Sequence, residues 1–395
     1  MSQWIGVGTS REKDSFRAAR EAAILAKAAT KQQDTDLVLI FSSVHYNPEN
    51  VIKGTRQIMP EAKIIGCSGS GIIMPRTIEE RGLSILAIKS NSIKLGLGCC
   101  SNLNEKNIRT AGQELAKMSL ANFKTASRDI FIMFSDGLIK NSSELILGVE
   151  DILGRSFPLI GAASSDNLRF TKTYQYYQNN AFANSAVGIL LGLNSGFGFG
   201  IKHGWKPIGK PRLVTDSEAN VIKKINNEPA INMYEEYFGD DITELKKTRL
   251  SRLTILYPIG INIPGEDEFI LRNILETTDD GSLICQGDVP TGAEINLMLG
   301  SKDFCIQAAR DAAKEAKKGL KDKPASLIII FDSAARLKLM GRFASSEIDA
   351  VKEVLGKNIP IVGFYSYGEI APLKAMGFRG TSYFHNEAIA VLAIG

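Results

Sequence analysis

The chain has 395 residues, of which 44% are hydrophobic and 23% are charged, and its formal net charge is +4. Such a composition is typical of a globular protein with enough residues for two or three full-sized cores. The small net charge argues against nucleic acid as a partner. The basic run at residues 246–249 is short and has no aromatic neighbours, so we interpret it as a solvated face.

The N-terminal residues lack a basic-then-apolar signal pattern, and no apolar run reaches the roughly 18 residues that span a bilayer. We therefore expect a cytoplasmic protein that has no membrane contact. The five cysteines include no C-x-x-C pair, which fits reduced thiols better than disulfides. The three histidines lie far apart in the sequence, so we expect neither a metal site nor another cofactor.

One pattern of predicted elements occurs three times along the chain. An amphipathic helix precedes an apolar strand with a polar end, and a second helix, a glycine-containing strand and one more apolar strand follow. The predicted first helices span about 13–29, 105–121 and 303–319, and the polar-ended strands span 36–43, 129–136 and 325–333. The glycine-containing strands span 62–71, 157–167 and 360–369, and the last strands span 82–90, 186–194 and 387–395.

A strand with a glycine exit comes before each first helix, in the segments WIGVGTS, IKLGLGCCS and EINLMLGSK. The repeated unit is therefore strand, helix, strand, helix, strand, strand, and it predicts an α/β fold in which three modules form helix-covered mixed sheets.

Residues 196–290 interrupt the pattern between the second and third copies. This insert begins with the Gly- and Pro-rich segment GFGFGIKHGWKPIGKP, and we expect a helix near 217–238 followed by a β-meander. We accordingly predict an N-terminal domain at 1–210 with two modules, and a C-terminal domain at 211–395 with the insert and the third module.

Polar residues follow the predicted strands at their carboxyl ends, where open α/β sheets collect ligands. The candidate ligand-binding residues are Ser42, Ser43, Cys67 and Ser68 in the first copy, Ser135 and Asp136 in the second, and Ser333, Arg336, Tyr365, Ser366, Tyr367 and Glu369 in the third. For the serines, helix capping is the competing interpretation.

Arg336 and Glu369 stand at the mouths of neighbouring predicted strands. A guanidinium can hold a ligand carboxylate with two hydrogen bonds, and a carboxylate can accept from an ammonium group. The pair therefore predicts a clamp for a zwitterion such as an amino acid. The alternative is that the two side chains simply pair with each other.

Catalytic motifs are incomplete in this sequence. The segment from Gly204 to Lys210 imitates a phosphate-binding loop, but Pro211 stands where Ser or Thr would bind magnesium. The turn from Gly66 to Ser70 ends in Ser rather than in the glycine of a nucleophile elbow. Cys67 could be an activated thiol, although an inert buried cysteine is the favoured interpretation.

The repeated strands, together with the segments YPIGI, DGSLICQGDVPTGAEINLML, VGFYSYGEIAP and HNEAIAVLAIG, resemble the FIST family of paired N- and C-terminal sensory domains. The resemblance covers nearly the whole chain and implies small-ligand binding in signalling, with amino acids as one ligand class. Ile72 stands where the family usually has Glu in its first turn, and Ser333 stands where it has Cys. The C-terminal site is therefore the stronger candidate.

The sequence is compatible with three functions. The leading one is a sensory protein that binds a small ligand and passes its signal to a separate protein partner. The second is an enzyme, a transferase or hydrolase, that uses Cys67 or a hydroxyl at the same edge. The third is a structural scaffold in which every polar strand end is satisfied internally.

Overall fold

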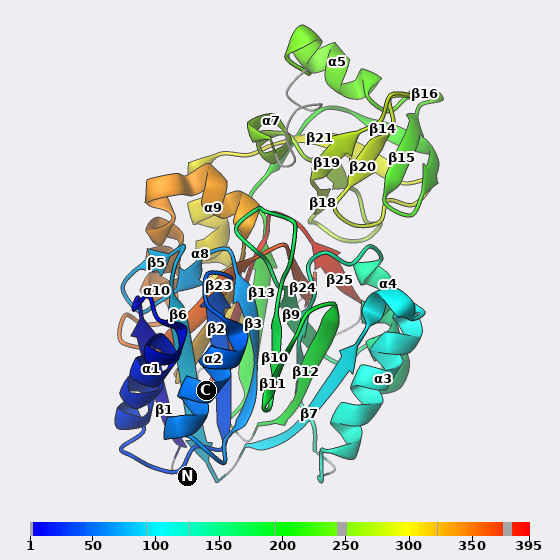
Figure 1. Cartoon of the computed structure of the whole chain (residues 1–395). Helices are drawn as coiled ribbons and strands as arrows, with labels where there is room; N and C mark the ends of the chain where they lie inside the picture. Colours follow the sequence, from blue (N-terminus) through cyan, green and yellow to red (C-terminus); the bar gives the residue numbers. More distant parts are fainter. Residues whose placement is uncertain are drawn as a thin grey trace.

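The computed structural model describes residues 3–91, 93–125, 127–193, 195–242, 251–321, 323–373 and 381–395. Three six-stranded sheets with helices on their outer faces form the body, and an eight-stranded sheet from the insert lies above them in Figure 1. The mixed α/β class and the three modules expected from the sequence are thus confirmed. The basic run at 246–249 lies outside the described residues.

The three modules follow one another in the chain and have equivalent elements. The first has β1 (Gln3–Ser10), α1 (Ser15–Ala29), β2 (Leu37–Ser43), α2 (Pro48–Ile58), β3 (Lys63–Gly69), β4 (Ile72–Ile73), β5 (Ile78–Glu79) and β6 (Leu83–Ser90). The second has β7 (Lys94–Ser101), α3 (Ile108–Ala121), β8 (Ile130–Ser135), α4 (Ser142–Leu153), β9 (Leu159–Ala163), β10 (Gln175–Tyr177), β11 (Asn180–Phe182) and β12 (Ser185–Gly192). The third has β13 (Phe197–Lys202), α8 (Lys302–Gly319), β22 (Leu327–Ser333), α9 (Ala334–Met340), α10 (Ser345–Leu355), β23 (Ile361–Ser366), β24 (Gly368–Pro372), β25 (Ser382–His385) and β26 (Ile389–Ile394).

Each module sends two strands into the sheet of another module. The sheet orders are β1-β6-β2-β3-β10-β11, β7-β12-β8-β9-β24-β25 and β13-β26-β22-β23-β4-β5. The first module therefore completes the third sheet, the second completes the first, and the third completes the second. In each sheet the two strands with polar carboxyl ends run parallel, as in the pair β22 and β23, so these ends meet at one edge.

Glycines at repeated positions set how closely the elements approach. A Cβ atom at Gly66, Gly161 or Gly363 would lie 1.9, 1.9 or 2.0 Å from a carbonyl oxygen of the neighbouring parallel strand. The first strand of each module instead carries a G-x-G pair against its helix. At Gly198 in β13, a Cβ atom would lie 2.0 Å from the Ala316 carbonyl oxygen of α8. Both positions exclude every larger side chain, which explains why the glycines recur.

The third module begins at a different strand from the one predicted. β13 pairs with β26 as β1 pairs with β6, so the segment GFGFGIK is the first strand of this module. The predicted first strand, EINLML, is β21 (Glu294–Leu299), and it pairs with strands of the insert. The insert therefore interrupts the third module after its first strand, and the G-x-G pair of GFGFGIK was the overlooked signal.

The insert is mainly β-structure. It contains β14 (Lys206–Glu218), β15 (Val221–Ile225), β16 (Glu228–Pro229), α5 (Asn232–Phe238), α7 (Arg252–Leu256), β17 (Ile259–Ile261), β18 (Ile270–Arg272), β19 (Ile274–Thr277), β20 (Leu283–Cys285) and β21. The helix predicted near 217–238 was largely wrong, because only its end is helical. Ala219, Asn226 and Asn227 adopt positive φ angles of 50°, 51° and 68°, which form turns between short strands. The predicted domain boundary, between residues 210 and 211, falls inside β14.

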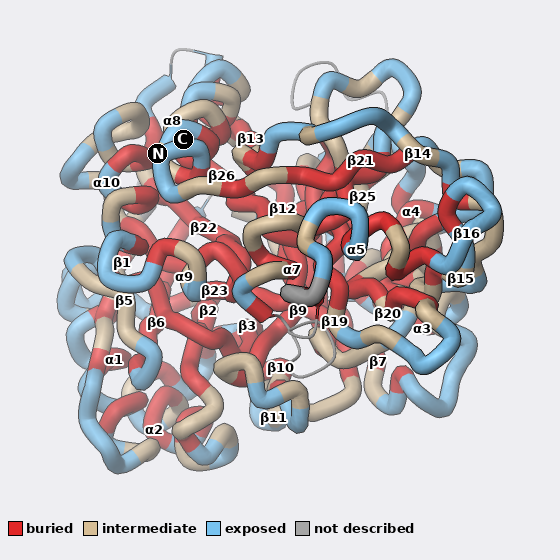
Figure 2. Tube along the Cα trace, turned by 90° about the horizontal axis from the view of Figure 1, so that it is seen from above, coloured by how far each residue is buried: buried red, intermediate tan, exposed pale blue. Residues whose placement is uncertain are grey.

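The inner faces of the three sheets meet in one apolar core, and the helices cover their outer faces (Figure 1). Phe41, Phe134 and Phe331 occupy equivalent positions in β2, β8 and β22. The ring centroids of Phe41 and Phe134 are 5.5 Å apart, and those of Phe134 and Phe331 are 5.8 Å apart. Figure 2 shows buried residues concentrated in these strands and exposed ones on the surrounding helices and turns.

Candidate functional site

Arg336 lies in α9 directly after β22, and its side chain is fully buried. The guanidinium donates to the carbonyl oxygens of His203 at 2.5 Å and Cys305 at 3.0 Å. It also pairs with Asp332, with Nε to Oδ1 at 3.0 Å, and with Glu347. Its donors are therefore directed at protein groups.

The described residues do not show the alternative in which Arg336 and Glu369 simply pair with each other. Among the described residues, no hydrogen bond or ion pair joins these two side chains. Glu369 instead accepts from Ser366 Oγ at 2.6 Å and from the Ala388 backbone N–H at 3.1 Å. The structure thus shows neither the direct pair nor an open clamp, because both side chains are fully buried with internal partners.

Four buried carboxyl groups lie in this region with one guanidinium, and we call Asp332, Arg336, Glu347, Glu369 and Glu387 the arginine cluster. Burial raises the pKa of the Glu369 carboxyl to about 8. Burial also raises the pKa values of Asp332 and Glu387 well above their usual range. Because one cation cannot compensate four buried charges, burial favours the protonated form of Glu369 and Glu387, which form no ion pair with Arg336 among the described residues.

The other predicted residues of the third module also have internal roles. Ser333 caps α9, since its side chain accepts from the Ala335 N–H at 3.2 Å. Tyr365 is fully buried, and its backbone carbonyl accepts from the Ser165 hydroxyl at 2.6 Å. The Tyr367 hydroxyl donates to Asp166. Capping and a bond between modules therefore account for the Ser333 and Tyr367 side chains, whereas the buried Tyr365 hydroxyl has no hydrogen-bond partner among the described residues.

The first and second modules meet the third through the same kind of contacts. Ser68 Oγ donates to the Ser165 carbonyl at 3.0 Å, so Ser68, Ser165 and Tyr365 link all three modules. The hydroxyl groups of Ser42 and Tyr176 are 2.6 Å apart, and Ser43 Oγ lies 3.3 Å from His45 Nδ1.

At the end of β8, Asp136 accepts from the backbone N–H groups of Leu138 at 2.8 Å and Asn184 at 2.7 Å. The Ser135 carbonyl accepts from the Ser164 hydroxyl at 2.8 Å. All twelve predicted residues lie within the described chain and are at most 4% exposed.

An open cleft of about 410 Å³ lies next to these buried residues, between the second module and the insert. Its walls come from the loop after β8 at 137–142, from Phe170 and Phe384, and from residues 220–221, 275–276 and 284–287 of the insert. We call this space the strand-end cleft. Its polar lining includes Lys140, Asn220, Glu276 and Gln286, whereas Phe170 and Phe384, the latter from β25 of the third module, supply apolar surface.

Tyr367 supports this cleft from behind. Its ring stacks on Phe170 with centroids 4.7 Å apart and planes 11° apart, and its backbone carbonyl accepts from the Gln286 amide. Asp166 fixes the same region by accepting from Tyr367 and from the Phe170 N–H at 2.9 Å. The predicted motif around Tyr367 is therefore beside the cleft rather than inside it. Phe170, Gln286 and Lys140 were missed because no sequence motif marks them.

Cys67 does not have the surroundings of an activated thiol. It is fully buried in the central core, and burial raises the pKa of its thiol well above the usual value. Cys285 borders the strand-end cleft, and burial raises its thiol pKa to about 12. Both cysteines are therefore protonated at neutral pH.

The described residues show neither a metal-binding cluster nor a membrane-spanning helix. No group of three or more His, Cys, Asp and Glu side chains in these ranges is arranged to hold a metal ion. Among the helices that the structure describes, none combines the length and the apolar composition that crossing a bilayer requires.

Comparison with known families assigns both halves of the chain. Residues 36–228 match the FIST N domain, and residues 230–372 match the FIST C domain. The chain belongs to the FIST family. These two matches confirm the resemblance found in the sequence. FIST domains are sensory domains of signalling proteins. Ile72, which stands where the family usually has Glu, lies in β4 and pairs with Phe364 of the third sheet.

Two relatives of this FIST protein are proteins described as uncharacterized. An uncharacterized protein of Mycobacterium tuberculosis is 23% identical over 377 residues, which cover 93% of this chain and 95% of the relative. Another from Methanocaldococcus jannaschii is 26% identical over 373 residues, covering 85% of this chain and 69% of the relative. The names of these relatives identify no ligand.

Solved structures give a weaker likeness. A cyanuric acid hydrolase from A. caulinodans is similar with a TM-score of 0.40 and 8% sequence identity, and the comparison covers 100% of this chain and 99% of that one. A second cyanuric acid hydrolase structure has a TM-score of 0.32, with 10% identity and complete coverage of both chains. Likeness at this level carries no argument about activity.

Proposed function

We propose that this FIST protein is a cytoplasmic sensor that binds a small ligand, an amino acid or a small carboxylate, in the strand-end cleft. The observation that carries the proposal is the cleft itself, which has a volume of about 410 Å³ at the carboxyl end of the parallel strands. Its size falls within the range of small-molecule sites, and its position is where open α/β sheets bind ligands.

The lining suits a ligand that has one carboxylate and an apolar part. Lys140 is exposed on the loop after β8, and its ammonium group can pair with a carboxylate. Phe170, Phe384 and Leu275 offer apolar surface. The Asn220 side-chain amide donates to the Cys285 carbonyl at 2.8 Å, which leaves its oxygen as an acceptor for a ligand N–H.

The arrangement also provides a route for a signal. The second module and the insert both contribute walls, so a ligand that contacts both of them would favour one relative position. We infer that a separate signalling protein reads this change on the surface of the insert. The insert has an apolar core made mostly of its own residues, and its Arg272 and Gln286 donate to the carbonyl oxygens of Phe384 and Tyr367, which connects the insert to the body.

A thermal-shift screen of amino acids and small carboxylates tests this proposal. A ligand at 100 times its Kd should stabilise the native state by about 2.7 kcal/mol. Lys140→Gln and Phe170→Ala should each weaken the best hit, by roughly ten-fold for the aromatic wall. Lys117→Gln on α3 and Phe343→Ala are the matched exposed controls. Failure of every compound to shift the melting temperature, or equal losses in the controls, would contradict the proposal.

A further inference from the structure

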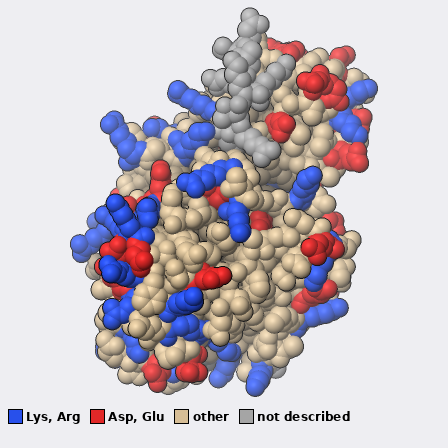
Figure 3. Space-filling view, in the orientation of Figure 1, with Lys and Arg blue, Asp and Glu red and all other residues tan. Residues whose placement is uncertain are grey.

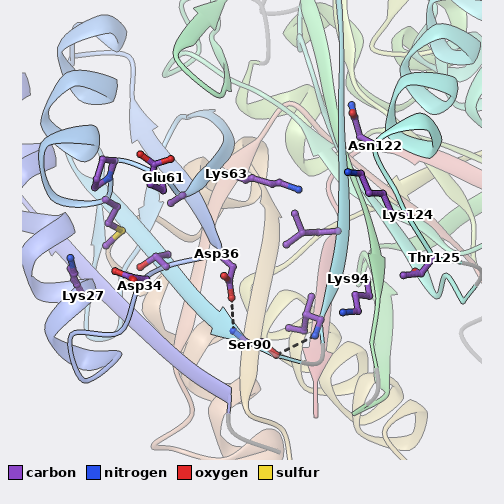
Figure 4. Close-up of a pocket in the computed structure, with 16 residues that line it drawn as sticks. Lys27, Asp34, Asp36, Glu61, Lys63, Ser90, Lys94, Asn122, Lys124 and Thr125 are labelled. Atoms are coloured by element: carbon purple, nitrogen blue, oxygen red, sulfur yellow. Dashed lines mark hydrogen bonds between the residues drawn. The ribbon is translucent and has the colours of Figure 1, made fainter.

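A second depression lies at the opposite end of the strands, between the first and second modules (Figure 4). It has a volume of about 590 Å³ and is bounded by the starts of β2, β3 and β7 and by the chain after α3. We call it the amino-end pocket. A seven-residue strand such as β2 rises by roughly 20 Å, so this pocket is well separated from the strand-end cleft.

Three lysine side chains extend into this pocket from different segments. Lys63 is the first residue of β3, Lys94 is the first residue of β7, and Lys124 follows α3. Figure 4 shows Lys63 reaching from the first module toward the wall of the second module, from which Lys94 and Lys124 project. Within the described ranges, no carboxylate lies within ion-pair distance of these three ammonium groups.

Three carboxylates also line the pocket, and all three come from the first module. Asp36 is already engaged, since it accepts from Lys89 Nζ at 3.0 Å and from the Ser90 N–H at 2.9 Å. Asp34 and Glu61 belong to the first-module side, where Figure 4 places them with Lys27. The wall from the second module therefore carries basic charge, with Asn122 and Thr125 as additional polar groups.

We propose that the amino-end pocket binds a small polyanion, either a polycarboxylate or a phosphorylated metabolite. Both classes carry two or more anionic groups, which can contact lysines from both modules at once. Each ammonium is a rotatable point charge that accommodates carboxylate or phosphate oxygens. In the free protein, water screens the three exposed cations from one another. A polyanion gains from several such contacts, whereas a monovalent anion can satisfy only one.

Calorimetric titration of the whole protein with citrate, pyrophosphate and acetate tests the proposal at constant ionic strength. Citrate or pyrophosphate should bind, and acetate should bind far more weakly. Binding of citrate alone identifies a polycarboxylate site, and binding of pyrophosphate alone identifies a phosphate site. Absence of binding by both polyanions would overturn the proposal.

Substitutions then locate the site. Lys94→Gln and Lys124→Gln should each weaken the bound polyanion roughly five-fold, as expected for one exposed ionic contact. Lys53→Gln on the exposed face of α2 removes the same charge away from the pocket and should leave affinity unchanged. An equal loss in Lys53→Gln would show a nonspecific charge effect and would contradict the proposal.

Discussion

The second and third modules end their parallel strands in different ways. In the third module α9 begins at Ala334, directly after β22, and its Arg336 is closed into the arginine cluster. In the second module, β8 ends at Ser135 and α4 begins only at Ser142. The intervening loop lines the strand-end cleft. The same repeat therefore holds a buried charge cluster in one copy and borders an open cleft in another, depending on how soon a helix follows the strand.

The largest effect should come from separating the modules. Residues 195–395 lack β4 and β5, which complete the third sheet, and residues 1–194 lack β24 and β25, which complete the second sheet. Each half would expose an unpaired sheet edge, so neither should show a cooperative urea transition by circular dichroism. Co-expression of the two halves should restore the transition. Cooperative unfolding of residues 195–395 alone would show that the third module does not need the first.

Removal of the buried guanidinium should be the next largest effect. Arg336→Met leaves Asp332 and Glu347 buried without their cation and should lower the free energy of unfolding by about 3–5 kcal/mol. Arg109→Met is the matched control, because it breaks an exposed ion pair with Asp151 and should destabilise the protein far less. Urea unfolding measures both values. Equal stability of the two variants would mean that the arginine cluster is not structural.

The pH dependence of stability should separate the sealed site from the open one. The pKa of Glu369 is raised from 4.5 to about 8 in the folded protein, so the folded state binds the proton more tightly. Its contribution is therefore fully present below pH 4.5 and is lost as the pH rises toward 8, with a slope of up to about 1.4 kcal/mol per pH unit.

Glu369→Gln removes this proton-binding group but keeps a side chain of similar shape. Stability measured by urea unfolding between pH 5 and 9 should fall less steeply in the variant than in the wild type. Lys140→Gln, which alters the open cleft, should retain the wild-type slope. Parallel curves for wild type and Glu369→Gln would contradict the assigned protonation.

The smallest effect should come from the support of the cleft. Tyr367→Phe keeps the ring that stacks on Phe170 but loses the hydroxyl that donates to Asp166. Because Asp166 still accepts from three backbone N–H groups, the loss should be about 1 kcal/mol. Thermal unfolding measures this change. A loss as large as that of Arg336→Met would place the main stabilising polar contacts at the cleft instead.

Much of the body could be predicted because local patterns determine it. Apolar β-branched runs marked β2, β8 and β22, and alanine-rich periodicity marked α1, α3 and α8. β13 was not predicted as the first strand of the third module because about a hundred residues separate it from α8. The strand directly before α8 in the sequence, β21, was predicted in its place. The strand pairs that join the sheet of another module, such as β4 and β5, are too short to show a periodic hydrophobic pattern. β4 pairs with β23 only when the first and third modules are packed together.

The candidate site was predictable only in part. The sequence located the polar strand ends, which indeed meet at one edge, but it could not show which of them remain open. Arg336 forms an ion pair with Glu347 of α10 and donates a hydrogen bond to the carbonyl oxygen of His203, which precedes the insert. Both contacts depend on tertiary packing. Phe170 and Gln286 come from separate loops and are joined only through Tyr367.

The most direct test of the account is a titration of the best hit from the amino acid and carboxylate screen into wild type, Lys140→Gln and Glu369→Gln. If the open cleft of the second module holds the ligand, Lys140→Gln should weaken binding roughly five-fold and Glu369→Gln should bind as wild type. Weaker binding in Glu369→Gln together with unchanged binding in Lys140→Gln would contradict the account and return the site to the third module.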